Sequence, residues 1–301
     1  MPGMIAKVRV FAPAKINLAL HVVGQRVDGY HLLDTLVGFA SVGDWVTLDA
    51  GPPDGLTIAG PEADGLMACD DNLVTRAARA FWPAGALGLH LDKHLPVASG
   101  IGGGSADAAA CIRGIDWLGG QRGHLAAPEP ARVRQMIALG ADVPMCLPSA
   151  PARAQGIGER ITPLPDLAKL PIVLVNPRVA VPTPMVFKAL ATKQNPEMSA
   201  LPPDLGNAAI LTDYLSHQRN DLQAPAIALA PVIAMVLDRI AATKDCALAR
   251  MSGSGATCFG IYPSPAAATT AAMALGRDNP GWWVRVAVLD GQDRAAPHPL
   301  N

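Results

Sequence analysis

A glycine-rich turn contains the residues best suited to bind an anionic ligand. It consists of Gly100, Ile101, Gly102, Gly103, Gly104 and Ser105, and an apolar helix is predicted directly after it, from about Ala106. Phosphate binding by a backbone needs N–H groups that a ligand can approach closely, and glycine leaves them unobstructed. The helix adds its positive end, and the Ser105 hydroxyl can cap the helix or face a phosphate or metal ion. The alternative is a flexible linker, but the run enters an apolar helix at once, so we predict a site for nucleotide phosphates.

Two common phosphate-binding motifs do not fit this turn. A P-loop requires Gly-Lys-Ser/Thr, and no lysine follows Gly104. A dinucleotide fingerprint requires glycine or alanine where Ser105 stands, within a parallel βαβ unit. The turn therefore represents a third kind of glycine loop.

The elements that must position this turn are strands and helices in irregular order. Residues 6–23 alternate in hydrophobicity, which predicts strand structure with a break at Pro13. Lys15 and Asn17 share the polar face of this strand, because side chains two residues apart point the same way. A buried strand at 171–175 begins a second unit. The pattern predicts the α+β class.

Length and composition set further limits. The 301 residues suffice for two domains, which we predict at 1–165 and 166–301. The formal net charge is −1 and the basic residues are dispersed, which excludes nucleic acid as the main partner. The five cysteines form no Cys-x-x-Cys pair, which is typical of buried thiols in a reducing compartment. No signal peptide and no apolar run of about 18 residues is visible, so we expect a cytoplasmic protein without a membrane partner.

Three sequence motifs resemble motifs of the GHMP kinase superfamily and occur along the chain in the same order. They are Pro13-Ala-Lys15-Ile-Asn17, then Pro96-x-x-x-Gly100-Ile-Gly-Gly-Gly-Ser105-Ala-Asp107, and later Met251-Ser-Gly-Ser-Gly255-Ala. The resemblance implies an N-terminal ATP-binding domain like domain 2 of ribosomal protein S5. It also implies a C-terminal ferredoxin-like α/β sandwich domain and an ATP-dependent small-molecule kinase.

Four further stretches are similar to one family within this superfamily, the 4-diphosphocytidyl-2-C-methyl-D-erythritol kinases. These stretches are Asp28-Gly-Tyr-His31, Gly140-Ala-Asp-Val-Pro144, Gly156-Ile-Gly-Glu159 and Asn220-Asp-Leu222. The resemblance implies ATP-dependent phosphorylation of the substrate's 2-hydroxyl, giving the 2-phosphate and ADP, in non-mevalonate isoprenoid biosynthesis. The substrate would be a small molecule, methylerythritol linked to cytidine diphosphate. The chain would be a monomer or a homodimer.

The resemblance also implies catalytic roles for Asp142 and Lys15. From sequence alone, Asp142 would be a turn or cap carboxylate and Lys15 a solvated strand lysine. In the family, the aspartate accepts or orients the proton of the attacking hydroxyl, and the lysine lies beside it. A cation there favours negative charge on the attacking oxygen.

Five residues are implied at the substrate: Asn17, Tyr30, His31, Thr183 and Phe187. Tyr30 would stack on the cytosine ring, with Phe187 as the second aromatic wall. His31 would hydrogen-bond the edge of the ring, because edge contacts discriminate between bases and stacking does not. The alternative is that Tyr30 is an ordinary aromatic residue that covers the sheet and that His31 is a surface histidine.

At the nucleotide, the resemblance implies Asn72 and Lys93 near the purine, with Pro96 and the glycine turn at the phosphates. Asn72 could equally cap a helix, and Lys93 could be a solvated strand end. Mg²⁺ is implied because a nucleotide triphosphate needs charge neutralisation, but its ligands stay unknown beyond Ser105 as a candidate. Two other functions stay open. One is a superfamily kinase for another alcohol such as mevalonate or homoserine, and the other is a catalytically silent nucleotide-binding regulator.

Overall fold

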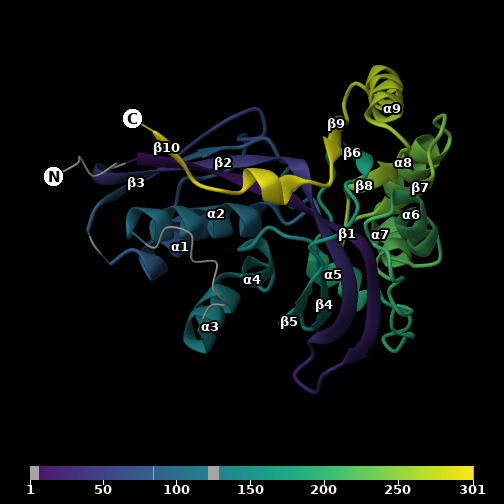
Figure 1. Cartoon of the computed structure of the whole chain (residues 1–301), viewed down its shortest axis with the longest axis horizontal. Coiled ribbons are helices and arrows are strands. Elements are labelled where there is room, and N and C mark those ends of the chain that lie inside the picture. Colours follow the sequence, from purple (N-terminus) through teal and green to yellow (C-terminus); the bar gives the residue numbers. More distant parts are fainter. Residues whose placement is uncertain (1–6, 84, 121–128, 301) are drawn as a thin grey trace.

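The computed structural model describes residues 7–83, 85–120 and 129–300, which form two sheets with helices packed on each (Figure 1). The first sheet has the order β10-β1-β2-β4-β5, with β3 pairing parallel to β2. Its strands are β1 (Lys7–Gln25), β2 (His31–Ala59), β3 (Leu87–Asp92), β4 (Ala152–Gly156), β5 (Arg160–Pro163) and β10 (His298–Leu300).

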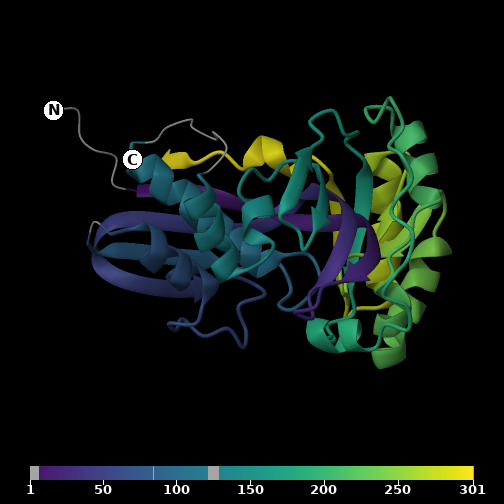
Figure 2. The same ribbon diagram turned by 90° about the horizontal axis from the view of Figure 1, so that it is seen from below.

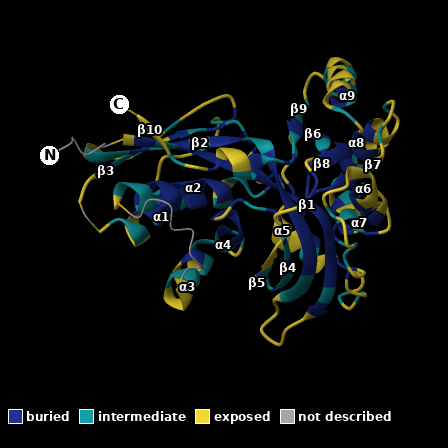
Figure 3. Cartoon of the chain, in the orientation of Figure 1, coloured by how far each residue is buried: buried dark blue, intermediate teal, exposed yellow. Residues whose placement is uncertain are grey.

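Strands β1 and β2 form one long antiparallel pair that reaches into both halves of the molecule. The pairing runs from Lys7 opposite Asp49 to Gln25 opposite His31. The predicted strand is confirmed, and the predicted break appears as a register shift between Pro13 and Lys15. Proline cannot donate to the strand ladder, so a bulge at this point costs no hydrogen bond. Figure 3 shows both strands buried where they pass between the two halves.

Helices cover one face of the first sheet. They are α1 (Leu73–Phe81), α2 (Gly103–Leu118), α3 (Pro130–Leu139) and α4 (Val143–Cys146). Ala106, Ala108, Ala109 and Ala110 of α2 are fully or almost fully buried, and such small side chains let the helix axis approach the sheet closely. This close packing fixes the start of α2, and with it the glycine turn, against β1.

The second sheet is antiparallel, in the order β7-β8-β6-β9. Its strands are β6 (Pro171–Asn176), β7 (Leu248–Met251), β8 (Cys258–Ile261) and β9 (Trp283–Val288). Helix α8 (Val232–Ala241) precedes β7, and α9 (Pro265–Asp278) connects β8 to β9. This β-α-β-β-α-β order with the first and third strands adjacent is the predicted ferredoxin-like topology. The remaining elements are α5 (Thr183–Lys188), α6 (Ala208–Ser216), α7 (Gln223–Leu229) and the 3₁₀ helix η1 (Gly291–Arg294).

Strand β6 shows how the two sheets share their cores. Ile172 and Leu174 pack with β1 residues of the first sheet, whereas Val173 and Val175 on the other face pack with α7, α8 and α9. In Figure 2 the second sheet and its helices lie at one end of the molecule, and the long strands of the first sheet extend toward it. We propose a domain boundary near residue 165, between β5 and β6, with β10 returning to pair with β1. In the part of the chain that the structure describes, no helix has the length and apolarity to cross a bilayer.

Candidate active site

A cleft of about 1200 Å³ collects the predicted site residues from both domains. Its lining includes Lys15, Asn17, Tyr30, His31, Asn72, Lys93, Pro96, Gly100, Gly102, Gly103, Gly104, Ser105, Asp142, Thr183 and Phe187. Ile101 does not line it, because the Ile101 side chain is fully buried in the core between the sheets. Pockets for drug-sized ligands measure roughly 300–1000 Å³. The cleft therefore exceeds the usual size of a pocket for one drug-sized ligand.

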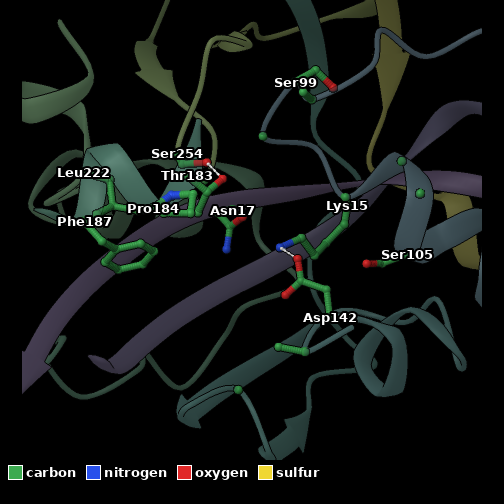
Figure 4. Close-up of a pocket in the computed structure, with 18 of the residues that line it drawn as sticks. Lys15, Asn17, Ser99, Ser105, Asp142, Thr183, Pro184, Phe187, Leu222 and Ser254 are labelled. Carbon is green, nitrogen blue, oxygen red and sulfur yellow. Dashed lines mark hydrogen bonds and ion pairs between the residues drawn. The ribbon is translucent and has the colours of Figure 1, made fainter. Parts of the chain in front are cut away.

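Lys15 and Asp142 form an ion pair at the centre of the cleft (Figure 4). The Lys15 Nζ lies 2.8 Å from Oδ2 of Asp142, although 127 positions separate the two residues in the chain. The Lys15 side chain is 7% exposed, so the interpretation as a solvated strand lysine is wrong. The Asp142 side chain is 39% exposed and makes no capping bond to α4, which leaves it open to the cleft. Its position supports a chemical role.

The backbone of the glycine turn joins this pair to the start of α2. The Lys15 N–H donates to the Ile101 carbonyl at 2.9 Å, which fixes the turn on β1. Gly102 has φ +66° and precedes the helix without a side-chain cap. A Cβ at Gly102 would lie 3.1 Å from the Lys15 Cβ, so a larger residue there would push the lysine side chain aside, and the positive φ also favours glycine.

Helix α2 begins at Gly103, three residues before the predicted start. Ser105 therefore lies inside the first turn, and its predicted alternative role as a helix cap is wrong. The first helical bond runs from the Ala106 N–H to the Gly102 carbonyl. The N–H groups of Gly103, Gly104 and Ser105 precede this bond at the positive end of the helix, where phosphate oxygens bind well.

A second glycine loop, from Ser252 to Gly255, supports the first from the other domain. The Ser252 hydroxyl donates to the Gly100 carbonyl at 3.1 Å and accepts from the Asn17 N–H at 3.0 Å. Asn220 holds the loop in place through its Nδ2, which donates to the Met251 and Gly253 carbonyls at 2.7 and 2.9 Å. Sequence reasoning found this loop by its motif but missed the supporting roles of Ser252 and Asn220.

Lys93 lies in a buried charge cluster beneath the first turn of α2. Its ammonium donates to both Asp44 and Asp107, and all three side chains are almost fully buried. Burial lowers the pKa of Lys93, but the two carboxylates outweigh this effect and raise it above the ordinary value. Burial, followed by repulsion from Asp44, raises the pKa of Asp107 well above its usual range. One ammonium between two carboxylates leaves one excess negative charge, which disfavours ionisation of Asp107.

This cluster contradicts the alternative of a solvated strand end for Lys93, and the predicted purine contact of Lys93 stays a prediction. Asp44 carried no signal in the sequence, because it reaches the cluster only through the pairing of β2. Asn72 caps α1 by accepting from the Val74 N–H at 2.9 Å, and it also lines the cleft. The capping alternative is thus confirmed, and it leaves the predicted nucleotide contact possible. Pro96 contributes its carbonyl, which accepts from the Ser99 hydroxyl at 2.6 Å.

Aromatic side chains lie at the far end of the cleft. Tyr30 is 60% exposed, so it does not cover the sheet. His31 stacks on Phe187, with ring centroids 4.7 Å apart and an interplanar angle of 26°. His31 Nε2 is buried and has no hydrogen-bond partner among the described residues. An aromatic surface beside an unpaired ring nitrogen suits a flat heterocycle with polar edges.

Two polar residues lie between this end of the cleft and the Lys15–Asp142 ion pair. Asn17 Nδ2 donates to Thr35 Oγ1 at 2.8 Å, while Asn17 Oδ1 is buried without a partner in the part of the chain that the structure describes. Thr183 Oγ1 lies 2.7 Å from the Ser254 hydroxyl. Figure 4 shows Asn17 between Thr183 and the Lys15–Asp142 pair. The substrate roles of these residues stay predictions.

Comparison with known proteins agrees with the geometry. Residues 72–149 match the model of the GHMP kinases N terminal domain, and residues 203–280 match that of the GHMP kinases C terminal region. The 4-diphosphocytidyl-2-C-methyl-D-erythritol kinase of Cereibacter sphaeroides is 54% identical over 284 residues, covering 93% of this chain and 99% of the relative.

Solved structures match the same group of kinases. A crystal structure of 4-(cytidine 5'-diphospho)-2C-methyl-D-erythritol kinase aligns with a TM-score of 0.71 at 34% identity, over 94% of this chain and 100% of the other. The homoserine kinase of Cytophaga hutchinsonii aligns with a TM-score of 0.68 at 20% identity, over 99% of this chain and 98% of the other, which shows a shared fold. The chain belongs to the 4-diphosphocytidyl-2-C-methyl-D-erythritol kinase family of the GHMP kinases.

Proposed function

We propose that this protein is an ATP-dependent kinase that phosphorylates the 2-hydroxyl of 4-diphosphocytidyl-2-C-methyl-D-erythritol. The products are the 2-phosphate and ADP, and the reaction serves non-mevalonate isoprenoid biosynthesis. The observation that carries the proposal is the Lys15–Asp142 ion pair in the same cleft as the glycine turn. The names of the full-length relatives, at 54% identity, support the choice of substrate.

In the proposed reaction the substrate oxygen forms a bond to the γ-phosphorus as the bond from that phosphorus to the bridging oxygen breaks. The leaving electron pair stays on ADP. An Asp142 carboxylate oxygen accepts the hydroxyl proton, and the Lys15 ammonium stabilises negative charge on the attacking oxygen. The N–H groups at the start of α2 hold the transferring phosphate in line. Phosphoryl transfer needs positioning and electrostatic stabilisation above all, and these groups supply both.

Mg²⁺ fits this site as a partner of the nucleotide. No group of three His, Cys, Asp or Glu side chains within the described ranges could hold a metal ion alone. Mg²⁺ usually keeps several waters and binds through one or two protein ligands plus substrate phosphates, so such a cage is not required. We propose that the Ser105 hydroxyl, which lines the cleft, lies beside the ion. When bound, the ion would neutralise charge on the β- and γ-phosphates.

The aromatic end of the cleft is the feature that favours a cytidine-bearing alcohol over mevalonate or homoserine. Those smaller substrates have no flat ring to place against Tyr30, or to offer polar edges to His31. We propose that the cytosine ring lies against Tyr30 and that its edge accepts or donates a hydrogen bond at His31 Nε2. Phe187, which stacks on His31, then holds the histidine ring in place, and Thr183 and Asn17 bind the diphosphate and alcohol portions.

The test combines a substrate panel with one variant. Wild-type protein should release ADP with the cytidylated alcohol and not with 2-C-methyl-D-erythritol 4-phosphate, mevalonate or homoserine. Asp142→Asn keeps the size of the side chain but removes its basicity, so kcat should fall by about 10²–10⁴-fold. Its Kd for ATP, measured by titration calorimetry, should stay near that of wild type.

Each outcome has a distinct meaning. Equal ADP release with a non-cytidylated alcohol would sink the choice of substrate and favour another superfamily kinase. Absence of ADP with every alcohol, despite ATP binding, would favour the silent regulator. A wild-type kcat in Asp142→Asn would remove the carboxylate from the mechanism.

A further inference from the structure

Arg178 occupies a backbone conformation that favours glycine, just beyond the end of β6. Its φ is +60°, and its N–H donates to Asn176 Oδ1 at 2.7 Å in a tight turn. A long side chain in this left-handed region costs conformational energy that the surroundings must offset. The arginine therefore makes contacts that hold it there.

Those contacts are made with Glu62 of the other domain. The two Arg178 terminal nitrogens lie 2.6 and 2.7 Å from the two carboxylate oxygens of Glu62, which is a bidentate pair. The Glu62 side chain is 4% exposed, whereas that of Arg178 is 49% exposed. A buried carboxylate needs its cation, because an unpaired buried charge is strongly unfavourable. The pair therefore fixes Glu62 more firmly than an ordinary surface ion pair would.

Glu62 stands at the start of a loop that forms one wall of the cleft. The loop is seated on the end of β3, since the Glu62 N–H donates to the Lys93 carbonyl at 3.0 Å. Leu66 and Asn72, which follow along the same loop, both line the cleft. Contacts that fix the position of Glu62 therefore also restrain the wall of the cleft that contains Asn72.

On its other side, Arg178 connects to the residue before the glycine turn through three successive hydrogen bonds. Asn176, which accepts from the Arg178 backbone, donates from Nδ2 to Thr257 Oγ1 at 2.9 Å. The Thr257 N–H in turn donates to the carbonyl of Ser99, directly before the turn, at 3.1 Å. Asn176 and Thr257 are almost fully buried. The second domain therefore contacts both the loop wall and the phosphate-binding turn through one continuous set of polar groups.

We propose that Arg178 is a positioning residue for the nucleotide: it holds the wall formed by residues 62–72 at a fixed distance from the glycine turn. This inference rests on the proposed function, in which that end of the cleft binds ATP. Arg178 does not line the cleft itself, so it acts through Glu62 and the loop. Without the pair, ATP binding would have to order the wall, and the ordering cost would weaken affinity for ATP and leave affinity for the alcohol unchanged.

The experiment compares Arg178→Gly with Arg178→Lys. Glycine suits φ +60° and removes the tether, whereas lysine keeps the charge but cannot bind a carboxylate in a bidentate manner. We expect Arg178→Gly to raise the Kd for ATP by about tenfold, with an unchanged KM for the cytidylated alcohol. Arg178→Lys should fall between Arg178→Gly and wild type. Lys169→Ala is the matched control, because it breaks an exposed ion pair with Asp293 that joins no cleft residue.

Thermal unfolding and the double variant Glu62→Gln/Arg178→Gly separate positioning from stability. The double variant removes the buried charge together with its partner, so it should recover stability but keep the weak ATP binding. The inference is overturned if ATP affinity matches wild type in the single variants. It is also overturned if ATP affinity returns together with stability in the double variant. Failure of wild type to phosphorylate the alcohol would instead count against the proposed function, because ATP affinities are measured without the alcohol.

Discussion

Gly102→Ala tests the link between the glycine turn and the proposed catalytic pair, Lys15 and Asp142. An added Cβ would lie 3.1 Å from Lys15 Cβ and 3.2 Å from Lys15 Cε, so the lysine must shift by a few tenths of an ångström. A misplacement of about 1 Å costs about 100-fold in rate, so we expect kcat to fall about fourfold to tenfold. Gly120→Ala is the matched control, because Gly120 has a φ of +80° and no atom of the residues that the structure describes lies within 4 Å of an added Cβ.

Both variants place alanine in the left-handed region, which costs ~1–2 kcal/mol. Each should therefore lower Tm by a similar few degrees, since ~1 kcal/mol corresponds to about 2–4 °C in chains approaching this size. Thermal unfolding measures this shared effect, and a coupled assay of ADP release measures kcat. If Gly102→Ala loses no more activity than Gly120→Ala, then the turn does not position Lys15, and the reasoning is refuted.

Two further predictions concern Tyr30 and His21. Tyr30→Ala should raise the KM for the cytidylated alcohol and leave the Kd for ATP unchanged, because it removes binding shared by ground and transition states; an unchanged KM would exclude stacking on Tyr30. His21 Nδ1 lies 3.1 Å from the Pro196 carbonyl, and the Arg219 N–H donates to Nε2, so the buried ring is neutral. Burial lowers the pKa of His21 from 6.5, and Arg219 lowers it further. The hydrogen bond to Pro196 and the charges of Asp221 and Asp34 oppose this shift without cancelling it. The unfolded chain then takes up the proton first as pH falls, so the stability that this histidine contributes is full above about pH 6.5 and is lost below it. Urea unfolding should show a steeper loss of stability between pH 7.5 and 5.5 in wild type than in His21→Asn, and equal slopes would contradict the assignment.

The fold class and the site motifs followed from the sequence because both depend on local patterns. Alternation over 6–23 predicted β1, and the glycine run predicted the anion-binding start of α2. The pairing of Lys15 with Asp142 was predicted only from the resemblance of the motifs to a kinase family, because no local sequence pattern implies it. Without that resemblance, residue type and position favoured the interpretation of Lys15 as a solvated strand lysine and of Asp142 as a turn carboxylate. The first interpretation is wrong, because Lys15 is buried and pairs with a residue 127 positions away. Asp142 does lie in a turn before α4, but its carboxylate makes no capping bond and pairs with Lys15 instead.

Other features depend on the tertiary structure alone. Asp44 binds Lys93 only because β2 pairs with β3, and Arg178 reaches Glu62 only because the domains meet beside the cleft. Neither pair has a spacing that a sequence pattern could reveal, since the partners are 49 and 116 positions apart. The start of α2 also shifted by three residues, because close packing on β1 lets helical structure extend into glycines that propensity disfavours.

The sequence by itself determined which groups are available for chemistry: a glycine turn, one lysine and one carboxylate, and an aromatic pair with a histidine. Residue type and short-range order are sufficient for that, because backbone freedom, charge and ring shape are properties of single residues. Tertiary structure decided which of these groups are buried, which are paired and which are left open to the cleft. Those properties depend on contacts between distant segments, as with Lys15, which is enclosed and paired, and Asp142, which stays accessible.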